Sequence, residues 1–330
     1  MLARILRFTL MISFVPVMLS CKRSGGAGNS VRIAVVPKGT THEFWKAVHA
    51  GAIKAGRETG VEVIWKGPLK EDDLKGQIDV VQSFTAQGVS GIVLAPLNDK
   101  ALEAPVKSAV EAGIPVVVFD SDLAGTSHKS FVATDNHAAG KMAGEKMAAL
   151  LGRKGKVAVL RYQEGSASTQ KREDGFLEAI RKVSTITVVS DNQYGGATTE
   201  SAFEKSESLL AAQNASTGGV DGVFCPNEST TFGMLLALRK VGLAGKIKLV
   251  GFDASEKLLA ALKEGHAHAL VVQDPFKIGY EAVRTMAEVV AAKPVQERID
   301  TGATVIEASS LDKPEVKALV APDLTPWLGK

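Results

Sequence analysis

VRIAVVPKGTTHEFW, residues 31–45, is the stretch that decides the fold class. Five of its first six residues are apolar, and four of these are β-branched, which predicts a buried strand that ends at Pro37. A short polar loop follows, and a helical pattern begins near Phe44 and Trp45. Because the loops after the carboxyl ends of strands form the ligand crevice of open α/β sheets, this unit is a candidate site for a small polar molecule. The alternative is an ordinary strand-to-helix turn with two core aromatic side chains.

The same alternation of apolar runs and helical patterns continues along the chain. Further strands are expected over residues 61–65, 88–96, 114–120, 131–135, 156–162, 185–190, 222–226, 248–253 and 268–274, and helices over 45–60, 72–87, 100–112, 137–151, 170–183, 198–212, 229–241, 255–264 and 276–292. Two runs of such units with similar length predict an α/β protein of two doubly wound parallel-sheet lobes.

The length and composition are those of a folded soluble protein with about two domains. The chain has 330 residues, of which 45% are hydrophobic and 23% are charged, and a single core seldom grows beyond roughly 250 to 300 residues. The formal net charge is only +3, and the sequence contains no basic run with interleaved aromatic residues. Nucleic acid is therefore not expected as a partner.

Residues 1–21 have the pattern of a secretory signal, in which two arginines precede an apolar run, 8–19, that is short for a membrane span. The run ends near Cys21 and resembles the bacterial lipobox, whose cysteine is lipidated and becomes the new N-terminus. Residues 18 and 19 depart from the usual lipobox, so a plain signal peptide cut near this point is the alternative. In both cases the mature protein lies outside the cytoplasm, with residues 22–30 as a flexible tether.

The two cysteines of the sequence, Cys21 and Cys225, offer no disulfide framework, no thiol nucleophile with supporting groups and no metal pair. GxSxG, HExxH and GxxxxGK[ST] motifs are also absent from the sequence. We therefore expect neither a metal nor a cofactor.

Small polar residues recur where the apolar strands end. These residues are Asp120, Asp135, Asn227, Asp253 and Gln273. The carboxyl ends of parallel strands share one rim of a sheet, so we expect these groups to gather at the crevice, where two facing lobes would enclose a ligand. The alternative for each residue is a turn or a helix N-cap, and Asp135 fits that alternative best because a helix follows it directly.

The order of several short motifs resembles the type I periplasmic sugar-binding proteins of ABC transporters, particularly the ribose-binding subgroup. The resemblance covers about residues 31–305 and is carried by VPKGTTHEFW, GIVLAP, IPVVVFDSD, VATDNHAAG, the RxxGF of 172–176, VFCPNEST, VGFDAS and VVQDPFKIG. It implies two lobes that are joined by a three-segment hinge and close over the ligand. The first lobe would then comprise 31–133 with about 274–300, and the second about 134–273 with about 301–310. Residues 311–330 would form a tail packed loosely on the surface.

The resemblance also implies which residues bind the ligand. Phe44 and Trp45 would stack on the apolar face of a sugar ring, and Tyr194 would stand where the family often has a third aromatic residue. Sugar hydroxyls both donate and accept hydrogen bonds, which suits planar polar side chains and carboxylates. The residues at the matching polar positions are Asp120, Arg172, Asn227, Asp253 and Gln273.

Three further positions depart from the ribose-binding pattern. Lys38 and His42 replace small polar residues of the first loop, and Gln170 replaces an arginine. The ligand is therefore expected to be a different monosaccharide or a polyol. Lys38 and His42 could alternatively be a solvated loop residue and a helix-start residue.

The function that these residues imply is an extracytoplasmic binding protein that captures a monosaccharide or polyol by hinge closure and delivers it to an ABC permease. We expect a monomer in the periplasm or at the cell surface, held at the membrane only by a lipid on Cys21. A subunit that presents ligand to a membrane sensor is an alternative. An enzyme is a less favoured one, in which Asp120 and Asp253 would flank the sugar as in a glycosidase. A transcription regulator of this fold would need a helix-turn-helix where the secretory segment stands.

Overall fold

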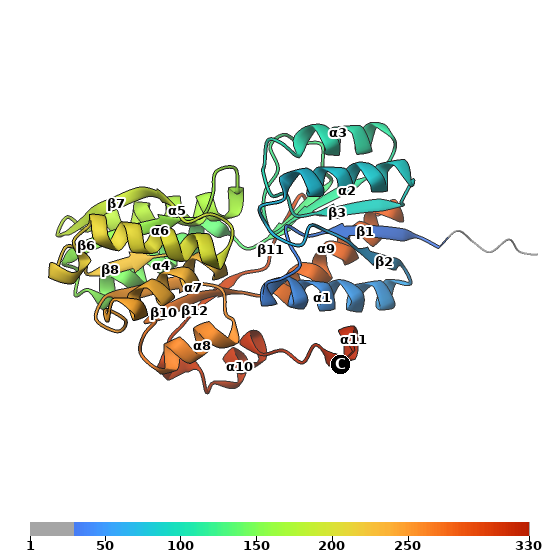
Figure 1. Ribbon diagram of the computed structural model, residues 1–330. Coiled ribbons are helices and arrows are strands. Elements are labelled where there is room, and N and C mark those ends of the chain that lie inside the picture. The colour runs from blue at the N-terminus through green and yellow to red at the C-terminus, as the bar shows by residue number, and fades with distance from the viewer. Residues whose placement is uncertain (1–29, 330) are drawn as a thin grey trace, which may run out of the picture. The chain divides into compact units, whose positions relative to one another are not determined.

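The computed structural model describes residues 30–329, and these form two α/β lobes, each built on a six-stranded sheet (Figure 1). The predicted signal peptide, the predicted lipidation site Cys21 and nearly all of the predicted tether lie outside the described residues. In the described part of the chain, no helix is long and apolar enough to cross a membrane.

The first lobe has a wholly parallel sheet with the strand order β11-β5-β4-β3-β1-β2. Its strands are β1 (Arg32–Val36), β2 (Glu62–Trp65), β3 (Gly91–Leu94), β4 (Val116–Phe119), β5 (Ser130–Ala133) and β11 (Arg298–Asp300), and its helices are α1 (Glu43–Thr59), α2 (Leu74–Ala86), α3 (Glu103–Glu111) and α9 (Pro275–Val290). Helices α1 and α9 cover one face, and α2 and α3 cover the other. The central strands are buried on both faces, which explains their continuous apolar sequences.

The second lobe repeats this plan with the strand order β12-β10-β9-β8-β6-β7. Its strands are β6 (Gly155–Arg161), β7 (Ile186–Tyr194), β8 (Gly222–Phe224), β9 (Lys248–Phe252), β10 (Ala269–Gln273) and β12 (Ala303–Ile306), and its helices are α4 (Asn136–Leu150), α5 (Ala167–Arg181), α6 (Thr199–Ala212), α7 (Glu228–Lys240) and α8 (Glu256–Lys263). Helices α4 and α5 cover one face, and α6, α7 and α8 cover the other. The sheet is not wholly parallel, because β12 runs antiparallel to β10.

Glycines allow the helices on one face of each sheet to cross at very short distance. A Cβ atom on Gly51 of α1 would lie 1.9 Å from the carbonyl oxygen of Phe276, and one on Gly279 of α9 would lie 1.9 Å from that of Val48. In the second lobe, α4 and α5 meet in the same way at Gly140 and Gly175. These contacts are possible only without a side chain.

The chain passes between the two sheets three times, from β5 to α4, from β10 to α9 and from β11 to β12. This confirms the predicted architecture of two lobes joined by three segments. The sequence did not predict β11 or β12, which contain three and four residues and lie at sheet edges. Both strands are too short to show a clear period, although β12 ends at the buried Ile306.

The C-terminal tail is more ordered than the loose surface packing predicted from its sequence. After the 3₁₀ turn Ala308–Ser310 it contains α10 (Pro314–Val320) and α11 (Thr325–Leu328). Leu311 and Val316 are buried against the core of the second lobe. At α11, the Arg57 side chain of α1 donates a 2.8 Å hydrogen bond to the Pro326 carbonyl. The tail therefore contacts both lobes.

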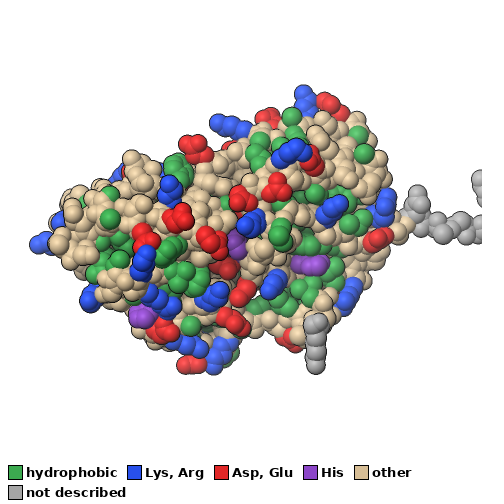
Figure 2. Space-filling model, in the orientation of Figure 1, with side chains coloured by type: hydrophobic (Ala, Val, Ile, Leu, Met, Phe, Trp, Pro, Cys, Tyr) green, Lys and Arg blue, Asp and Glu red, His purple; other side chains and the backbone are tan. Residues whose placement is uncertain are grey.

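Charged side chains of both signs are interspersed over the face drawn in Figure 2. On this face Lys and Arg alternate with Asp and Glu, as the small net charge of the sequence predicts. This face presents no extended area of positive charge of the kind that binds a nucleic-acid backbone.

Candidate ligand-binding site

Two aspartates at strand ends mark the centre of the candidate site. Asp120 follows β4 and Asp253 follows β9, and both have a left-handed backbone, with φ of 59° and 66°. This conformation costs a non-glycine residue roughly 1–2 kcal/mol, although Asp tolerates it better than most residues. Both side chains are buried and line one narrow cavity between the two lobes. Strained residues that cluster around a cavity are typical of binding sites.

Nine of the eleven predicted ligand-binding residues line this cavity. They are Lys38, His42, Phe44, Trp45, Asp120, Arg172, Asn227, Asp253 and Gln273. Most of them lie at the carboxyl ends of strands or at the start of the next helix, as the crevice rule for α/β sheets predicts, while Arg172 lies within α5.

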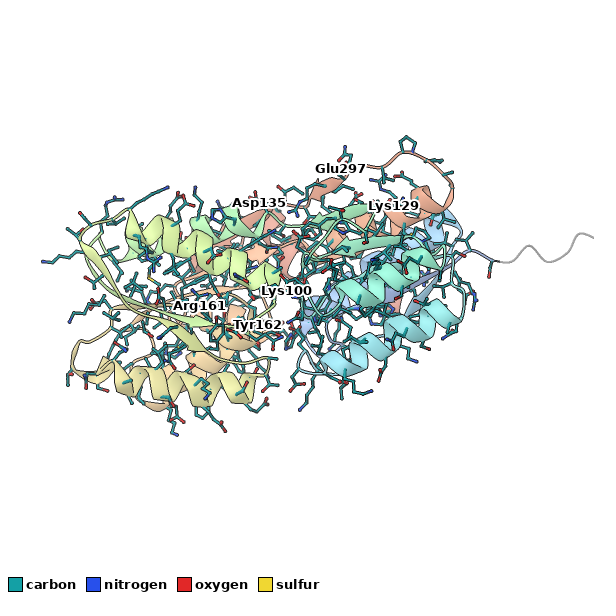
Figure 3. The ribbon with its side chains drawn as sticks, turned by 90° about the horizontal axis from the view of Figure 1, so that it is seen from above. Lys100, Lys129, Asp135, Arg161, Tyr162 and Glu297 are labelled. Carbon is teal, nitrogen blue, oxygen red and sulfur yellow. The ribbon has the colours of Figure 1, made fainter. Side chains whose placement is uncertain are left out.

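Glu71, in the loop between β2 and α2, connects the aromatic side chains of the cavity. Its carboxylate accepts hydrogen bonds from Trp45 Nε1 at 2.6 Å and from the Tyr162 hydroxyl at 2.5 Å, and it lies 3.0 Å from His42 Nδ1. Tyr162 follows β6, at the end of the second lobe near the first (Figure 3). The bond between Glu71 and Tyr162 therefore joins the two lobes.

Glu71 and His42 form a buried ion pair. Burial opposes both charges, but the hydrogen bond and the mutual attraction outweigh it, so the pKa of Glu71 is lowered to about 2 and that of His42 is raised to about 9. The imidazole is therefore protonated at neutral pH. It donates to the carboxylate and carries a positive charge at the edge of the cavity.

Lys38 makes a second contact between the lobes. Its ammonium group donates hydrogen bonds to the hydroxyls of Ser166 at 3.1 Å and Ser168 at 3.2 Å, and it lies 3.7 Å from the Asp120 carboxylate. The side chain is only 4% exposed. Burial lowers the pKa of Lys38, and the nearby Asp120 opposes this shift. A buried ammonium with this set of partners is not a solvated loop lysine.

Arg172 of α5 is held rigidly on the other side of the cavity. Its Nε donates to Asn136 Oδ1 at 2.7 Å, and its Nη1 donates to the Pro226 carbonyl at 2.9 Å. The guanidinium carbon lies 4.0 Å from the centre of the Phe252 ring, which is a cation–π contact. Burial lowers the pKa of Arg172, while Asp253 and Asp120 favour its charged form. The fixed fork offers directed donors to a ligand.

Two acceptors at the cavity have no donor among the described residues. Gln273 Nε2 donates to Asp253 Oδ1 at 2.7 Å, which leaves Gln273 Oε1 unpaired. Glu228 Oε2 is also unpaired, and burial raises the pKa of this carboxyl to about 7. Each buried polar atom without a partner costs about 1–3 kcal/mol. A ligand hydroxyl, which both donates and accepts hydrogen bonds, would remove this cost.

The cavity therefore combines aromatic rings with fixed hydrogen-bonding groups, two of which lack a partner among the described residues. Its cations (Lys38, His42 and Arg172) stand against carboxylates of similar number, so the charge is nearly balanced. Within residues 30–329, no group of three or more His, Cys, Asp or Glu side chains is arranged to hold a metal ion. This chemistry suits a neutral molecule with several hydroxyl groups.

Comparison with known families decides the class of protein. Residues 33–294, most of the chain, match the model of the periplasmic binding protein domain. The chain belongs to the periplasmic binding protein family. This confirms the resemblance predicted from the sequence motifs.

Relatives of this periplasmic binding protein are named for the sugars that they bind or import. The D-allose-binding periplasmic protein of Escherichia coli is 27% identical over 275 residues, which cover 80% of this chain and 86% of the relative. The ribose import binding protein RbsB of Bacillus subtilis is 29% identical over 260 residues, covering 78% and 80%.

Solved structures of periplasmic binding proteins share the fold. A carbohydrate transporter solute-binding protein of Agrobacterium radiobacter, in complex with D-arabinose, has a TM-score of 0.84 and 31% identity and covers 89% of this chain and 100% of its own. A solute-binding protein of Agrobacterium vitis with bound D-fucose has a TM-score of 0.83 and 34% identity, with coverage of 88% and 99%.

Two of the predicted ligand-binding residues of this periplasmic binding protein, Gln170 and Tyr194, do not line the cavity. Helix α5 begins at Ala167, three residues before the predicted start, so Gln170 faces solvent. Residues 168 and 169 share the buried face with residue 172, which lies four and three positions further along the helix. Tyr194 ends the long edge strand β7, is 38% exposed, and has the Arg161 guanidinium 5.9 Å from its ring centre.

The sequence predictions did not include five residues that line the cavity. They are Glu71, Tyr162, Ser168, Thr169 and Glu228. Tyr162 follows a strand, so the strand-end rule applied to the aspartates could have found it. Glu71 stands in the charged run KEDD, which is typical of a solvated loop and gives no signal of burial.

The N-cap alternative holds for two strand-end residues. Asp135 accepts a hydrogen bond from the Ala138 backbone at the start of α4 and does not line the cavity. Asn227 caps α7 by accepting from the Thr230 backbone at 3.2 Å and also lines the cavity. One residue can therefore serve both purposes.

Proposed function

We propose that the protein captures a neutral monosaccharide or polyol outside the cytoplasm and delivers it to an ABC permease. The observation that carries this proposal is the pair of unpaired acceptors, Gln273 Oε1 and Glu228 Oε2, in a cavity that also holds two strained aspartates. The sugar ligands named for the relatives support the chemical class.

The mechanism follows from the contacts between the lobes. The Glu71–Tyr162 and Lys38–Ser168 hydrogen bonds form only when the two lobes are close together. A ligand in the cavity gains contacts from both lobes only in this closed form, so its binding shifts the population toward closure. The permease would then recognise the closed surface.

The location at the membrane is part of the proposal. The full-length chain would be secreted, lipidated at Cys21 and held by that lipid as a monomer. Fractionation of cells that express the full-length chain distinguishes an anchored protein from a released one. Size-exclusion chromatography with light scattering measures the oligomeric state.

The ligand is best identified by a thermal-shift screen of pentoses, hexoses and polyols. A ligand at 100 times its Kd stabilises a protein by about 2.7 kcal/mol, which is easily detected as a rise in Tm. A screen in which no member of these classes raises Tm would contradict the proposal.

Asp253→Asn should then weaken binding of the ligand by at least tenfold, because each orphaned or weakened buried hydrogen bond costs about 1–3 kcal/mol. Asp120→Asn should behave in the same way, and isothermal titration calorimetry measures both. Asp135→Asn is the matched control, since Asp135 also follows a strand but caps α4 outside the cavity. An equal loss of affinity in the control would contradict the site.

A further inference from the structure

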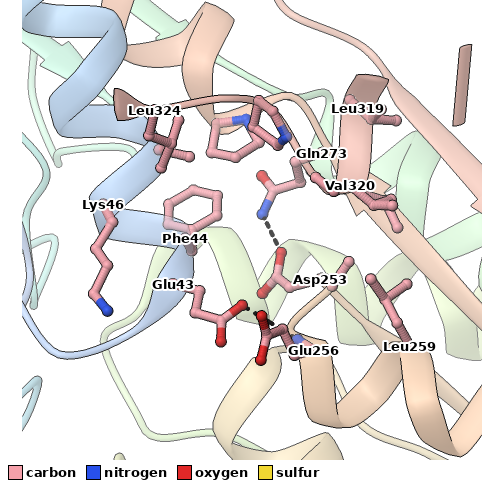
Figure 4. A pocket seen from close by; sticks show the side chains of 16 residues that line it. Glu43, Phe44, Lys46, Asp253, Glu256, Leu259, Gln273, Leu319, Val320 and Leu324 are labelled. Carbon is pink, nitrogen blue, oxygen red and sulfur yellow. Dashed lines mark hydrogen bonds between the residues drawn. The ribbon is translucent and has the colours of Figure 1, made fainter. Parts of the chain in front are cut away.

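A second cavity lies beside the candidate site and is partly walled by the C-terminal tail (Figure 4). This tail-side cavity has a volume of about 520 Å³, which lies in the range of small-molecule pockets. Phe44, Asp253 and Gln273 line both the tail-side cavity and the candidate site. The two spaces therefore share one wall.

Most of the residues that line the tail-side cavity are apolar, and polar groups share its surface. Its apolar walls are formed by Phe44, Leu259, Val272, Leu319, Val320 and Leu324. The charged side chains of Glu43, Lys46 and Glu256 also line the cavity and are exposed. Glu43 accepts a 3.2 Å hydrogen bond from the Glu256 backbone. The six apolar side chains offer a contact surface to an apolar chemical group.

A buried, unpaired acceptor lies in the shared wall. Gln273 is 2% exposed, its nitrogen is engaged by Asp253, and its Oε1 has no donor among the described residues. Figure 4 shows this side chain beside Phe44, facing the cavity. The geometry thus calls for a ligand hydroxyl at the boundary between the two spaces.

The tail that walls the cavity is fastened at both ends. Val316 is buried in the core of the second lobe. On the first lobe, Arg57 donates to the carbonyls of Pro326 at 2.8 Å and Trp327 at 3.3 Å, and its guanidinium carbon lies 5.3 Å from the Trp327 ring centre. The wall formed by residues 319–324 is therefore a fixed part of the fold.

We propose that the tail-side cavity holds an apolar substituent of the ligand, so that the protein binds glycosides with a short alkyl or aryl group. The sugar ring occupies the candidate site, a hydroxyl donates to Gln273 Oε1, and the substituent passes Phe44 into the space under Leu319. This inference rests on the proposed function, because it extends the ligand of the same site.

The test uses the folded chain without the predicted signal peptide. The ligand panel pairs each free sugar with its methyl and phenyl glycosides, and both anomers are included. Calorimetry should show at least one phenyl glycoside that binds tenfold more tightly than its methyl counterpart. If free sugars bind and no phenyl glycoside binds, the inference is overturned and the proposed function stands. Failure of the whole panel would overturn both.

A variant that fills the cavity makes the test specific. Leu319→Trp should weaken the phenyl glycoside at least tenfold and leave the Kd of the free sugar within a factor of two. Leu328→Trp is the matched control, because Leu328 belongs to the same tail, is 37% exposed and does not line the cavity. If Leu319→Trp fails to fold, Leu324→Trp replaces it. A filled cavity that does not change phenyl-glycoside affinity would overturn the inference.

Discussion

Glu71 and His42 are the residues on which the closed arrangement of the cavity depends most directly. The Glu71 carboxylate is surrounded by an indole and an imidazolium from the start of α1 and a phenol from the second lobe. All its partners lose their acceptor if it is removed, and one of them is a buried charge. Breaking a buried ion pair in this way is usually strongly destabilising.

Glu71→Gln should therefore lower the free energy of unfolding by about 3–5 kcal/mol, because the neutral amide keeps the shape but cannot balance His42. Urea denaturation monitored by circular dichroism measures this. Glu111→Gln is the control, since its ion pair with Lys107 is 3.9 Å long and exposed to solvent, and it should change stability by less than about 1 kcal/mol. Similar effects of the two substitutions would contradict a structural role for Glu71.

The His42 charge should make stability depend on pH. Its folded pKa of about 9 lies above the ordinary value of 6.5, so its contribution is full below pH 6.5 and disappears as the pH rises through 9. Wild type should thus exceed His42→Gln in unfolding free energy by about 1–3 kcal/mol at pH 6, and the gap should close by pH 9.5. Denaturation curves of both proteins at several pH values test this, and a constant gap would show that the imidazolium charge is not responsible.

At the scale of elements, the crossing of α4 and α5 positions the ligand-facing side chains of the second lobe. Helix α5 carries Ser168 and Arg172, and its approach to α4 depends on Gly140 and Gly175. A side chain at either glycine would meet the backbone of the opposite helix at 2.1 Å, so the helices would have to separate. Arg172 would move with its helix.

Gly175→Ala should lower stability by about 1–3 kcal/mol, as overpacking usually does, and should also weaken ligand binding. Thermal unfolding and calorimetry measure the two effects. The neighbouring Asp174→Ala is the control, because Asp174 is exposed on the same helix and should change stability by at most about 0.5 kcal/mol. A Gly175 variant with unaltered stability would mean that the helices can separate without cost.

At the scale of the whole molecule, the tail links the two lobes in addition to the three crossing segments. A chain that ends at Ser310 should lose about 2–4 kcal/mol of unfolding free energy, because Leu311 and Val316 no longer cover the core of the second lobe. A chain that ends at Ala321 keeps these two residues and lacks only α11, so its loss should be smaller. If the two shortened chains are as stable as the chain that keeps the whole tail, the tail does not contribute to the stability of the fold.

Much of the architecture follows from local physics. Continuous apolar runs such as 33–36 predict buried parallel strands, and alternation with helices predicts two α/β lobes. The strand-end aspartates Asp120 and Asp253 were found because parallel strands bring their carboxyl ends to one edge. The short edge strands β11 and β12 escaped prediction because three or four residues are too few to show a clear period.

The sequence by itself thus determined the fold class, because hydrophobic periodicity acts between near neighbours in the chain. Its short motifs carried the family resemblance, which implied most of the polar groups that face the cavity. Only the tertiary structure decided that Glu71 is buried, that Gln170 and Tyr194 face away, and that the tail walls a second cavity. These outcomes depend on pairs such as Glu71 with Tyr162 and Arg57 with Trp327, which lie 91 and 270 residues apart in the chain. Contacts over such separations arise only when whole lobes pack together, so no local pattern records them.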